Sequence, residues 1–80
     1  MKDLFLTEQE WNKLKKKLIN GFGKETWAQK FGYAWEGNYF KVGKKRYSYL
    51  LRPDLKGVIV IADKRLLKLL QENDIKFEEW

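Results

Sequence analysis

The sequence predicts an α+β fold, namely a small antiparallel sheet of three to four strands with an N-terminal and a C-terminal helix packed on one face. Two observations lead to this prediction. Apolar residues recur at helical spacing near both ends of the chain, and apolar or aromatic residues alternate with polar ones through its middle. Because 80 residues suffice for one domain, we expect residues 1–80 to form a single domain.

The first helix has recognisable start and stop signals. Thr7 and Glu10 have the spacing of a capping box, so the helix is expected to begin after Thr7. Residues 11–18 then carry apolar side chains at intervals of three and four, which place them on one face. Asn20-Gly21 should end the helix, because glycine readily adopts the left-handed conformation there.

Residues 24–32 allow two interpretations. The pattern Thr26-Trp-Ala-Gln29 can cap a short helix that ends at Gly32, or the segment can be a loop that leads into a strand. A helix here would fit a winged-helix fold, in which it reads DNA and a hairpin at Gly37-Asn38 or Gly43-Lys44 is the wing. We favour the sheet, because strand patterns outweigh helical ones after residue 32.

Alternation predicts the strands of the middle region. We expect turns at Gly37-Asn38 and Gly43-Lys44 and a loop at 53–57, where proline and glycine bracket the segment. The segment 58–62 is apolar on both faces and should therefore be central in the sheet. The expected strands cover residues 33–36, 39–42, 45–52 and 58–62. In the third of these, Lys45, Tyr47, Tyr49 and Leu51 should share one face, and Arg46, Ser48, Leu50 and Arg52 the other.

The last third of the chain predicts a second helix and a tail. Asp63 is the expected N-cap, four leucines between residues 66 and 70 form the buried stripe, and Asn73-Asp74 ends the helix. The tail 75–80 alternates, as an edge strand does, and its glutamates would discourage aggregation through that edge.

Composition excludes several classes of function. The chain has no Cys and no His, so it has neither disulfides nor Cys/His metal sites, and the usual catalytic triads are impossible. The glycines lack the spacing of a phosphate loop. We therefore expect no cofactor and no enzymatic activity. The missing cysteines suit a reducing compartment, and no signal peptide or membrane span is recognisable. These features predict a cytoplasmic protein without membrane contact.

The positive charge lies unevenly along the chain. Of the net +6, residues 1–52 hold twelve Lys/Arg against five Asp/Glu, whereas residues 53–80 hold five against six. The segment 41–52 has five cations and no acid. A one-sided basic charge favours polyanionic partners, although a Lys-rich surface can equally serve solubility.

Aromatic side chains stand among the cations of residues 33–52. Cations follow phosphates and aromatic rings stack on bases, so this combination predicts binding of nucleic acid, preferably RNA or single-stranded DNA. Phosphate contacts are predicted for Lys41, Lys44, Lys45, Arg46 and Arg52. Base stacking is predicted for some of Trp35, Tyr39, Tyr47 and Tyr49. The opposing interpretation is that alternate aromatic residues on a strand belong to the core, and Trp11 should certainly be there.

Two rival functions remain open. A protein-interaction module that inhibits or regulates a larger complex would also be rich in Trp, Tyr and Arg. A ribonuclease toxin without histidine could use the set Lys44, Lys45, Arg46, Tyr47 and Arg52. This second rival has little support, because any nucleic-acid binder would contain the same residues.

Overall fold

The computed structural model describes the backbone of residues 1–27 and 35–80 and the side chains of residues 1–24 and 37–80. The elements follow one another as β1 (Lys2–Thr7), α1 (Glu8–Lys17), β2 (Gly21–Trp27), β3 (Trp35–Val42), β4 (Lys45–Arg52), the 3-10 turn η1 (Pro53–Leu55), β5 (Gly57–Ala62), α2 (Lys64–Glu72) and β6 (Glu78–Glu79).

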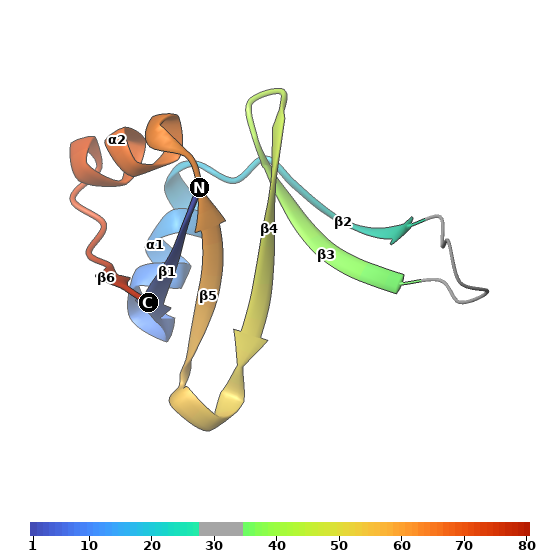
Figure 1. Ribbon diagram of the computed structural model, residues 1–80. Helices are drawn as coiled ribbons and strands as arrows, with labels where there is room; N and C mark the ends of the chain where they lie inside the picture. Colours follow the sequence, from blue (N-terminus) through green and yellow to red (C-terminus); the bar gives the residue numbers. More distant parts are fainter. Residues whose placement is uncertain (28–34) are drawn as a thin grey trace.

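The described strands form one sheet of six strands in the order β2-β3-β4-β5-β1-β6. Every pair of neighbours is antiparallel. Strands β2, β3, β4 and β5 are neighbours in the order of the sequence, as in a meander. Strand β1 lies on the other side of β5 and pairs with it over its whole length (Figure 1). Segments from the two ends of the chain, β1 and β6, are thus adjacent strands.

The expected sheet of three to four strands with terminal helices is therefore wrong. Six strands are present among the described residues, and both helices lie between strands of the sequence. Residues 4–6, for which no strand was expected, belong to β1. Gly21, which was expected to end the first helix, begins β2, and Gly23 lies in the same strand. Pairing with distant strands overrode these local preferences.

The predicted turn at Gly37-Asn38 is also wrong. Both residues lie inside β3 and pair with β2, Gly37 with Glu25 and Asn38 with Lys24. Thr26 and Trp27 are in β2, so the short helix does not begin where the capping pattern placed it, and the remainder of that prediction lies outside the described residues. The strand expected at 33–36 is described only from Trp35 onward.

Helix α1 begins as predicted and ends early. The N–H of Glu10 donates to the Thr7 hydroxyl at 3.3 Å, which confirms Thr7 as the N-cap. The Glu10 carboxylate instead accepts from the backbone N–H of Lys76 at 3.1 Å, so it ties the C-terminal segment to α1. The helix ends at Lys17, and Gly21 begins β2 rather than capping α1 with a positive φ.

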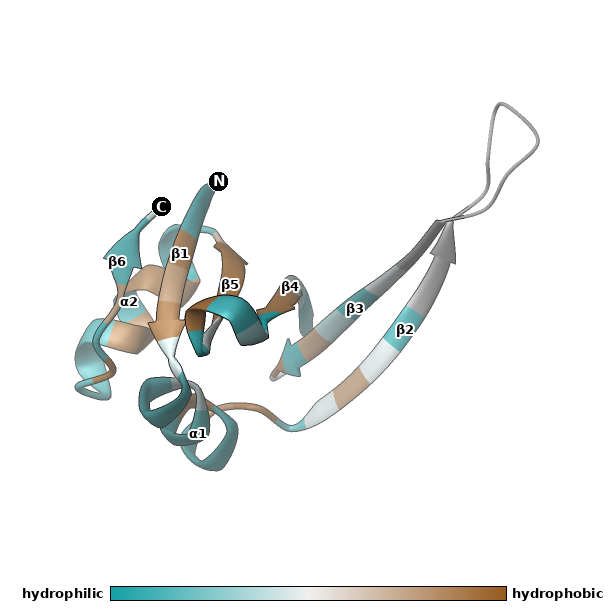
Figure 2. Cartoon of the chain, turned by 90° about the horizontal axis from the view of Figure 1, so that it is seen from below, coloured by the Kyte–Doolittle hydropathy of each residue, from teal (hydrophilic) through white to brown (hydrophobic). Residues whose placement is uncertain are grey.

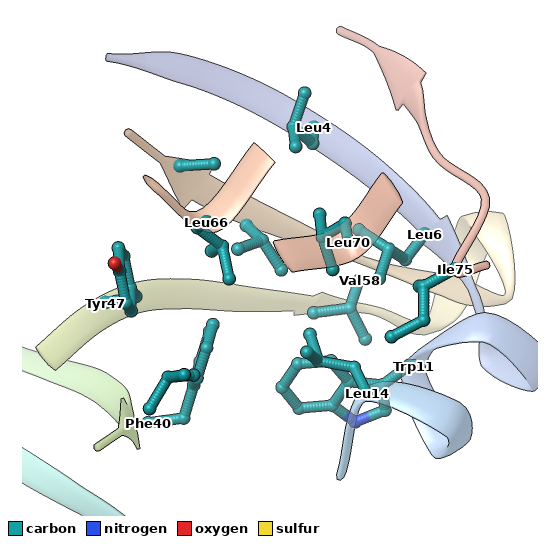
Figure 3. Packing of buried hydrophobic residues seen from close by; sticks show 13 residues of the cluster. Leu4, Leu6, Trp11, Leu14, Phe40, Tyr47, Val58, Leu66, Leu70 and Ile75 are labelled. Carbon is teal, nitrogen blue, oxygen red and sulfur yellow. The ribbon is translucent and has the colours of Figure 1, made fainter. Parts of the chain in front are cut away.

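Both helices contribute to one hydrophobic core on the same face of the sheet. Trp11 and Leu14 of α1 belong to the same buried cluster as Leu66 and Leu70 of α2, and Trp11 is buried as predicted (Figure 3). Ile75, between α2 and β6, is also a member, and the sheet supplies the rest of this cluster, which are Leu4, Leu6, Phe40, Val42, Tyr47, Val58, Val60 and Ala62. Removal of these side chains from water is the main force that holds the two layers together.

The β2–β3 pair extends beyond the rest of the sheet. The register pairs β3 with β4 only from Asn38 onward, whereas its pairing with β2 continues to Trp35 opposite Trp27. In Figure 2 these two strands project away from the helices as a ribbon. The part of β3 that pairs with β4 contains Tyr39 and Lys41, two of the residues predicted to bind nucleic acid.

Candidate nucleic-acid interface

The face of the sheet opposite the helices is the candidate interface. Residues that pair directly across antiparallel strands point to the same side. The register places Tyr39 beside Ser48, Lys41 beside Arg46, and Leu50 beside Ile59 on this open face. Leu50 is 55% exposed, so the open face is accessible to a partner.

The ring of Tyr39 reaches over β2 on the open face. Gly23 is its neighbour in β2, and a Cβ atom there would collide with the outer end of the Tyr39 ring. Glycine at position 23 is therefore what lets the ring lie across β2. The guanidinium of Arg46 sits over this ring, with Cζ 4.7 Å from its centroid, in cation–π geometry.

Two lysines lie next to Arg46, toward the β3–β4 turn. Lys41 is the cross-strand neighbour of Arg46, and Lys44 lies in the turn itself. The turn prediction at Gly43-Lys44 is confirmed, with Gly43 at a φ of +66° that glycine tolerates best. We call Tyr39, Lys41, Lys44 and Arg46 the basic cluster. Its cations are adjacent like charges, a combination that favours an anionic partner.

Two of the four predicted stacking rings are part of the core. Tyr47 is only 2% exposed and stacks on Phe40 with ring centroids 5.6 Å apart. Tyr49 is half-buried and packs against Trp11, with centroids 5.1 Å apart. Neither ring presents a face to a base, so the core interpretation holds for both. The side chain of Trp35, the remaining predicted ring, lies outside the described side chains.

Lys45 points to the helix side and pairs with Asp63, the N-cap of α2. Asp63 also accepts from the N–H of Leu66 at 2.9 Å and from the Tyr47 hydroxyl at 3.1 Å. Lys45 and these hydrogen bonds lower the pKa of Asp63 to about 2. Burial and the neighbouring carboxylate raise the pKa of Tyr47. Lys45 therefore stabilises the fold rather than facing a phosphate.

Arg52 is likewise engaged within the protein. Its guanidinium donates two hydrogen bonds to the Asp54 carboxylate, at 3.0 and 2.8 Å. This pairing raises the pKa of Arg52 and lowers the pKa of Asp54. A phosphate would have to displace Asp54 to reach Arg52. The structure therefore brings four of the nine predicted site residues together and assigns four others to the core or to ion pairs.

The residues proposed for a ribonuclease are not gathered into one site. Tyr47 and Lys45 face the helices, whereas Arg46 and Arg52 lie on the opposite face of β4. Among the described residues no group of His, Cys, Asp and Glu is arranged to hold a metal ion. Within the same residues, no helix combines the length and apolar character that crossing a membrane requires.

Sequence analysis missed the apolar half of the open face. Ile61 and Trp80 are 37% and 60% exposed, and the Trp80 ring packs against Phe5 in a tilted arrangement with ring centroids 5.6 Å apart. No local pattern joins Phe5 to Trp80, since they meet only because β6 pairs with β1. The alternation of β5 did contain a usable signal, because Ile59 and Ile61 must point away from Val58 and Val60.

The fold and the site together define a small two-layer α+β domain whose sheet has one face covered by helices and one face exposed. Comparison of the chain with protein-family models, with curated proteins and with solved structures gives no significant match.

Proposed function

We propose that the chain is a non-enzymatic protein that binds single-stranded nucleic acid, RNA or DNA, at the basic cluster. The observation that carries the proposal is the placement of Tyr39, Lys41 and Arg46 side by side on the open face, with Lys44 at the adjoining turn. Cations beside a partly exposed aromatic ring suit an unpaired polynucleotide, since it offers both phosphates and unstacked bases.

The proposed roles follow from the positions. Lys41, Lys44 and Arg46 contact successive phosphates, and a base stacks on the ring of Tyr39 once Arg46 has moved off it. In the unbound protein Arg46 covers this ring through their cation–π contact, so the two side chains act together. Stacking on such a ring is worth about 1–3 kcal/mol per base and discriminates little between sequences.

Three phosphate contacts predict a moderate salt dependence. For a single strand the slope of log K against log salt is about −0.7 per contact, so three contacts give about −2. Binding should therefore weaken about 20-fold between 50 and 200 mM salt. Fluorescence anisotropy with labelled single-stranded RNA, single-stranded DNA and duplex DNA at these two salt concentrations measures the slope and ranks the ligands.

Single substitutions test the site itself. Lys41→Ala, Lys44→Ala and Arg46→Ala should each weaken binding to every sequence and reduce the salt slope by about 0.7. Tyr39→Ala should weaken binding with little change of slope. Lys64→Ala on α2 is the matched control, because this exposed lysine lies outside the basic cluster. If the triple variant of the three cations binds as the unmodified protein does, the site is wrong.

A protein-interaction module is the second candidate. It is favoured by the exposed apolar side chains of Leu50, Ile61 and Trp80, because contiguous apolar surface often marks a docking site. The salt dependence of binding distinguishes the two candidate functions. Phosphate contacts weaken steeply as salt is raised, whereas apolar docking does not.

A further inference from the structure

A shallow pocket of about 230 Å³ lies on the open face next to the basic cluster. The residues of this face that line it are Asp3, Ser48, Leu50, Ile59, Ile61 and Trp80. The register explains the grouping, because Asp3 pairs with Ile61, and the backbone N–H of Trp80 donates to the carbonyl oxygen of Asp3 at 2.9 Å. The pocket therefore exists only because β1 pairs with β5 on one side and with β6 on the other.

Two polar side chains interrupt the apolar lining of this pocket. Within the part of the chain that the structure describes, neither the carboxylate of Asp3 nor the hydroxyl of Ser48 has a hydrogen-bond or ion-pair partner. An apolar lining with a few polar groups is typical of small-ligand sites, where the polar groups fix the orientation of the ligand. The pocket therefore suits a flat apolar ligand whose edge carries hydrogen-bond donors.

The two sides of the pocket differ in charge. Toward β3 it adjoins the basic cluster, because its lining residue Ser48 pairs with Tyr39. Toward β1 it ends at the carboxylate of Asp3. A polynucleotide has the same division, since its phosphates are anionic whereas the edges of its bases carry N–H donors. A strand whose phosphates contact the basic cluster can thus turn the edge of one base toward Asp3.

We propose that this pocket binds a guanine base of the single strand that the basic cluster holds, an inference that rests on the proposed function. An ionised carboxylate can only accept hydrogen bonds. Guanine offers two adjacent donors on its Watson–Crick edge, N1–H and N2–H, and they match the two oxygens of Asp3. Adenine, cytosine, uracil and thymine each place an acceptor beside their donor, so the carboxylate would face a lone pair. The plane of the base lies against Leu50, Ile61 and the indole of Trp80.

The pocket and the ring of Tyr39 hold different bases. This ring reaches over β2, whereas the pocket is lined by residues of β5, three strands further along the sheet. Neighbouring strands are about 4.8 Å apart, so about 14 Å separates the two positions. Stacking on Tyr39 accepts any base, whereas hydrogen bonding to Asp3 selects one. The strand would therefore be bound with little sequence preference except at one position.

Fluorescence anisotropy with two labelled oligonucleotides of about ten nucleotides tests the pocket. One is an oligouridine, and the other is the same strand with a single guanosine at its centre. Both offer the same phosphates to the basic cluster, so they differ only in the base that can enter the pocket. We expect the guanosine to strengthen binding at least about 5-fold, as one bidentate contact to a base does.

The variant Asp3→Asn separates guanine recognition from general affinity for a polyanion. Asparagine has the same size but offers one acceptor beside a donor, so the advantage of the guanosine strand should disappear. Because the variant also loses a negative charge, its affinity for oligouridine should stay the same or rise. Asp74→Asn is the matched control, since it removes the same charge from an exposed residue that follows α2, and it should keep the guanosine advantage.

The outcomes distinguish failure of the pocket from failure of the proposed function. Equal affinity for the two oligonucleotides, or a guanosine advantage that survives in Asp3→Asn, overturns the guanine pocket while the basic cluster still binds the strand. If neither oligonucleotide binds at about 50 mM salt, the proposed function is overturned and the pocket with it. Circular dichroism melts of the two variants show that each keeps the fold.

Discussion

The hydroxyl of Tyr47 donates a hydrogen bond of 3.1 Å to Oδ1 of Asp63, the residue that caps α2. The same carboxylate accepts from the N–H of Leu66 and pairs with Lys45. A side chain of β4 and the first turn of α2 are therefore fixed to each other through one acid. This contact holds the C-terminal helix on the face of the sheet opposite the basic cluster.

Replacement of Asp63 should destabilise the fold. Asp63→Ala removes the N-cap, which alone costs about 1–2 kcal/mol of the free energy of unfolding. It also leaves the buried Tyr47 hydroxyl without its acceptor. Asp63→Asn keeps a capping oxygen and should cost less than the alanine variant. Urea denaturation at pH 7 measures both, and equal losses in the two variants would contradict the capping role.

The stability of the fold should fall at acidic pH because of the same carboxylate, that of Asp63. The pKa of Asp63 is about 2 in the folded protein against an ordinary value of 3.8, so its contribution is complete above about pH 4. The contribution is lost as the pH falls from about 4 toward 2, because the unfolded chain binds the proton more tightly. Urea midpoints at pH 7, 4, 3 and 2 should decline, and the decline should be smaller in Asp63→Asn.

The stability of the fold should also fall at alkaline pH, and there the cause is Tyr47. Burial raises the pKa of Tyr47 above its ordinary value of 10.0, so the folded state holds this proton more tightly than the unfolded state. The stabilisation is present below pH 10 and is lost as the pH rises through the folded pKa. Tyr47→Phe should remove this alkaline loss. Thermal melts at pH 9, 10 and 11 of the two proteins would reveal it, and parallel curves would refute it.

Gly23 should control nucleic-acid binding without touching the ligand. A methyl group at position 23 would collide with the ring of Tyr39 and force it off β2, which also disturbs the contact with Arg46. Gly23→Ala should therefore weaken binding of single-stranded RNA about as much as Tyr39→Ala. Gly21→Ala is the control, because its nearest neighbour would be Cδ of Lys41 at 3.8 Å, an ordinary contact.

Gly57 should be important for stability rather than for binding. A Cβ atom there would collide with the backbone oxygen of Leu6 and with the ring of Phe5, and the backbone cannot move aside cheaply. Gly57→Ala should lower the free energy of unfolding by about 1–3 kcal/mol, as overpacked sites do. Gly21→Ala again serves as the control and should be neutral or slightly stabilising. Equal urea midpoints for the two variants would show that β1 and β5 have room to shift.

Local signals in the sequence were reliable where the chemistry is local. The N-caps Thr7 and Asp63 and the limits of β4 follow from residues within a few positions of each other, and all are confirmed. Strands β1 and β2 could not be recognised in the same way. Their pairing partners lie later in the chain, and the glycines of β2 argue against a strand unless its neighbours are known.

The candidate site was only partly predictable for a related reason. Alternation correctly separated Arg46 from Tyr47 on β4 but gave no indication which face the helices would cover. Trp11, Phe40 and Tyr49 pack together from three different elements, so the two tyrosines of β4 became core residues. The ion pair of Arg52 with Asp54 could have been predicted from the sequence, because the two residues lie two positions apart on either side of Pro53.

The position of β1 has a consequence for synthesis on the ribosome. Lys2 pairs with Ala62, so β1 must wait for sixty further residues before its partner strand exists. At about 5–20 residues per second this delay lasts several seconds, and β2, β3 and β4 are all synthesised within it. Closure of such a distant pair is slow compared with local contacts. The nascent chain therefore holds β1 without its partner strand β5 throughout that interval.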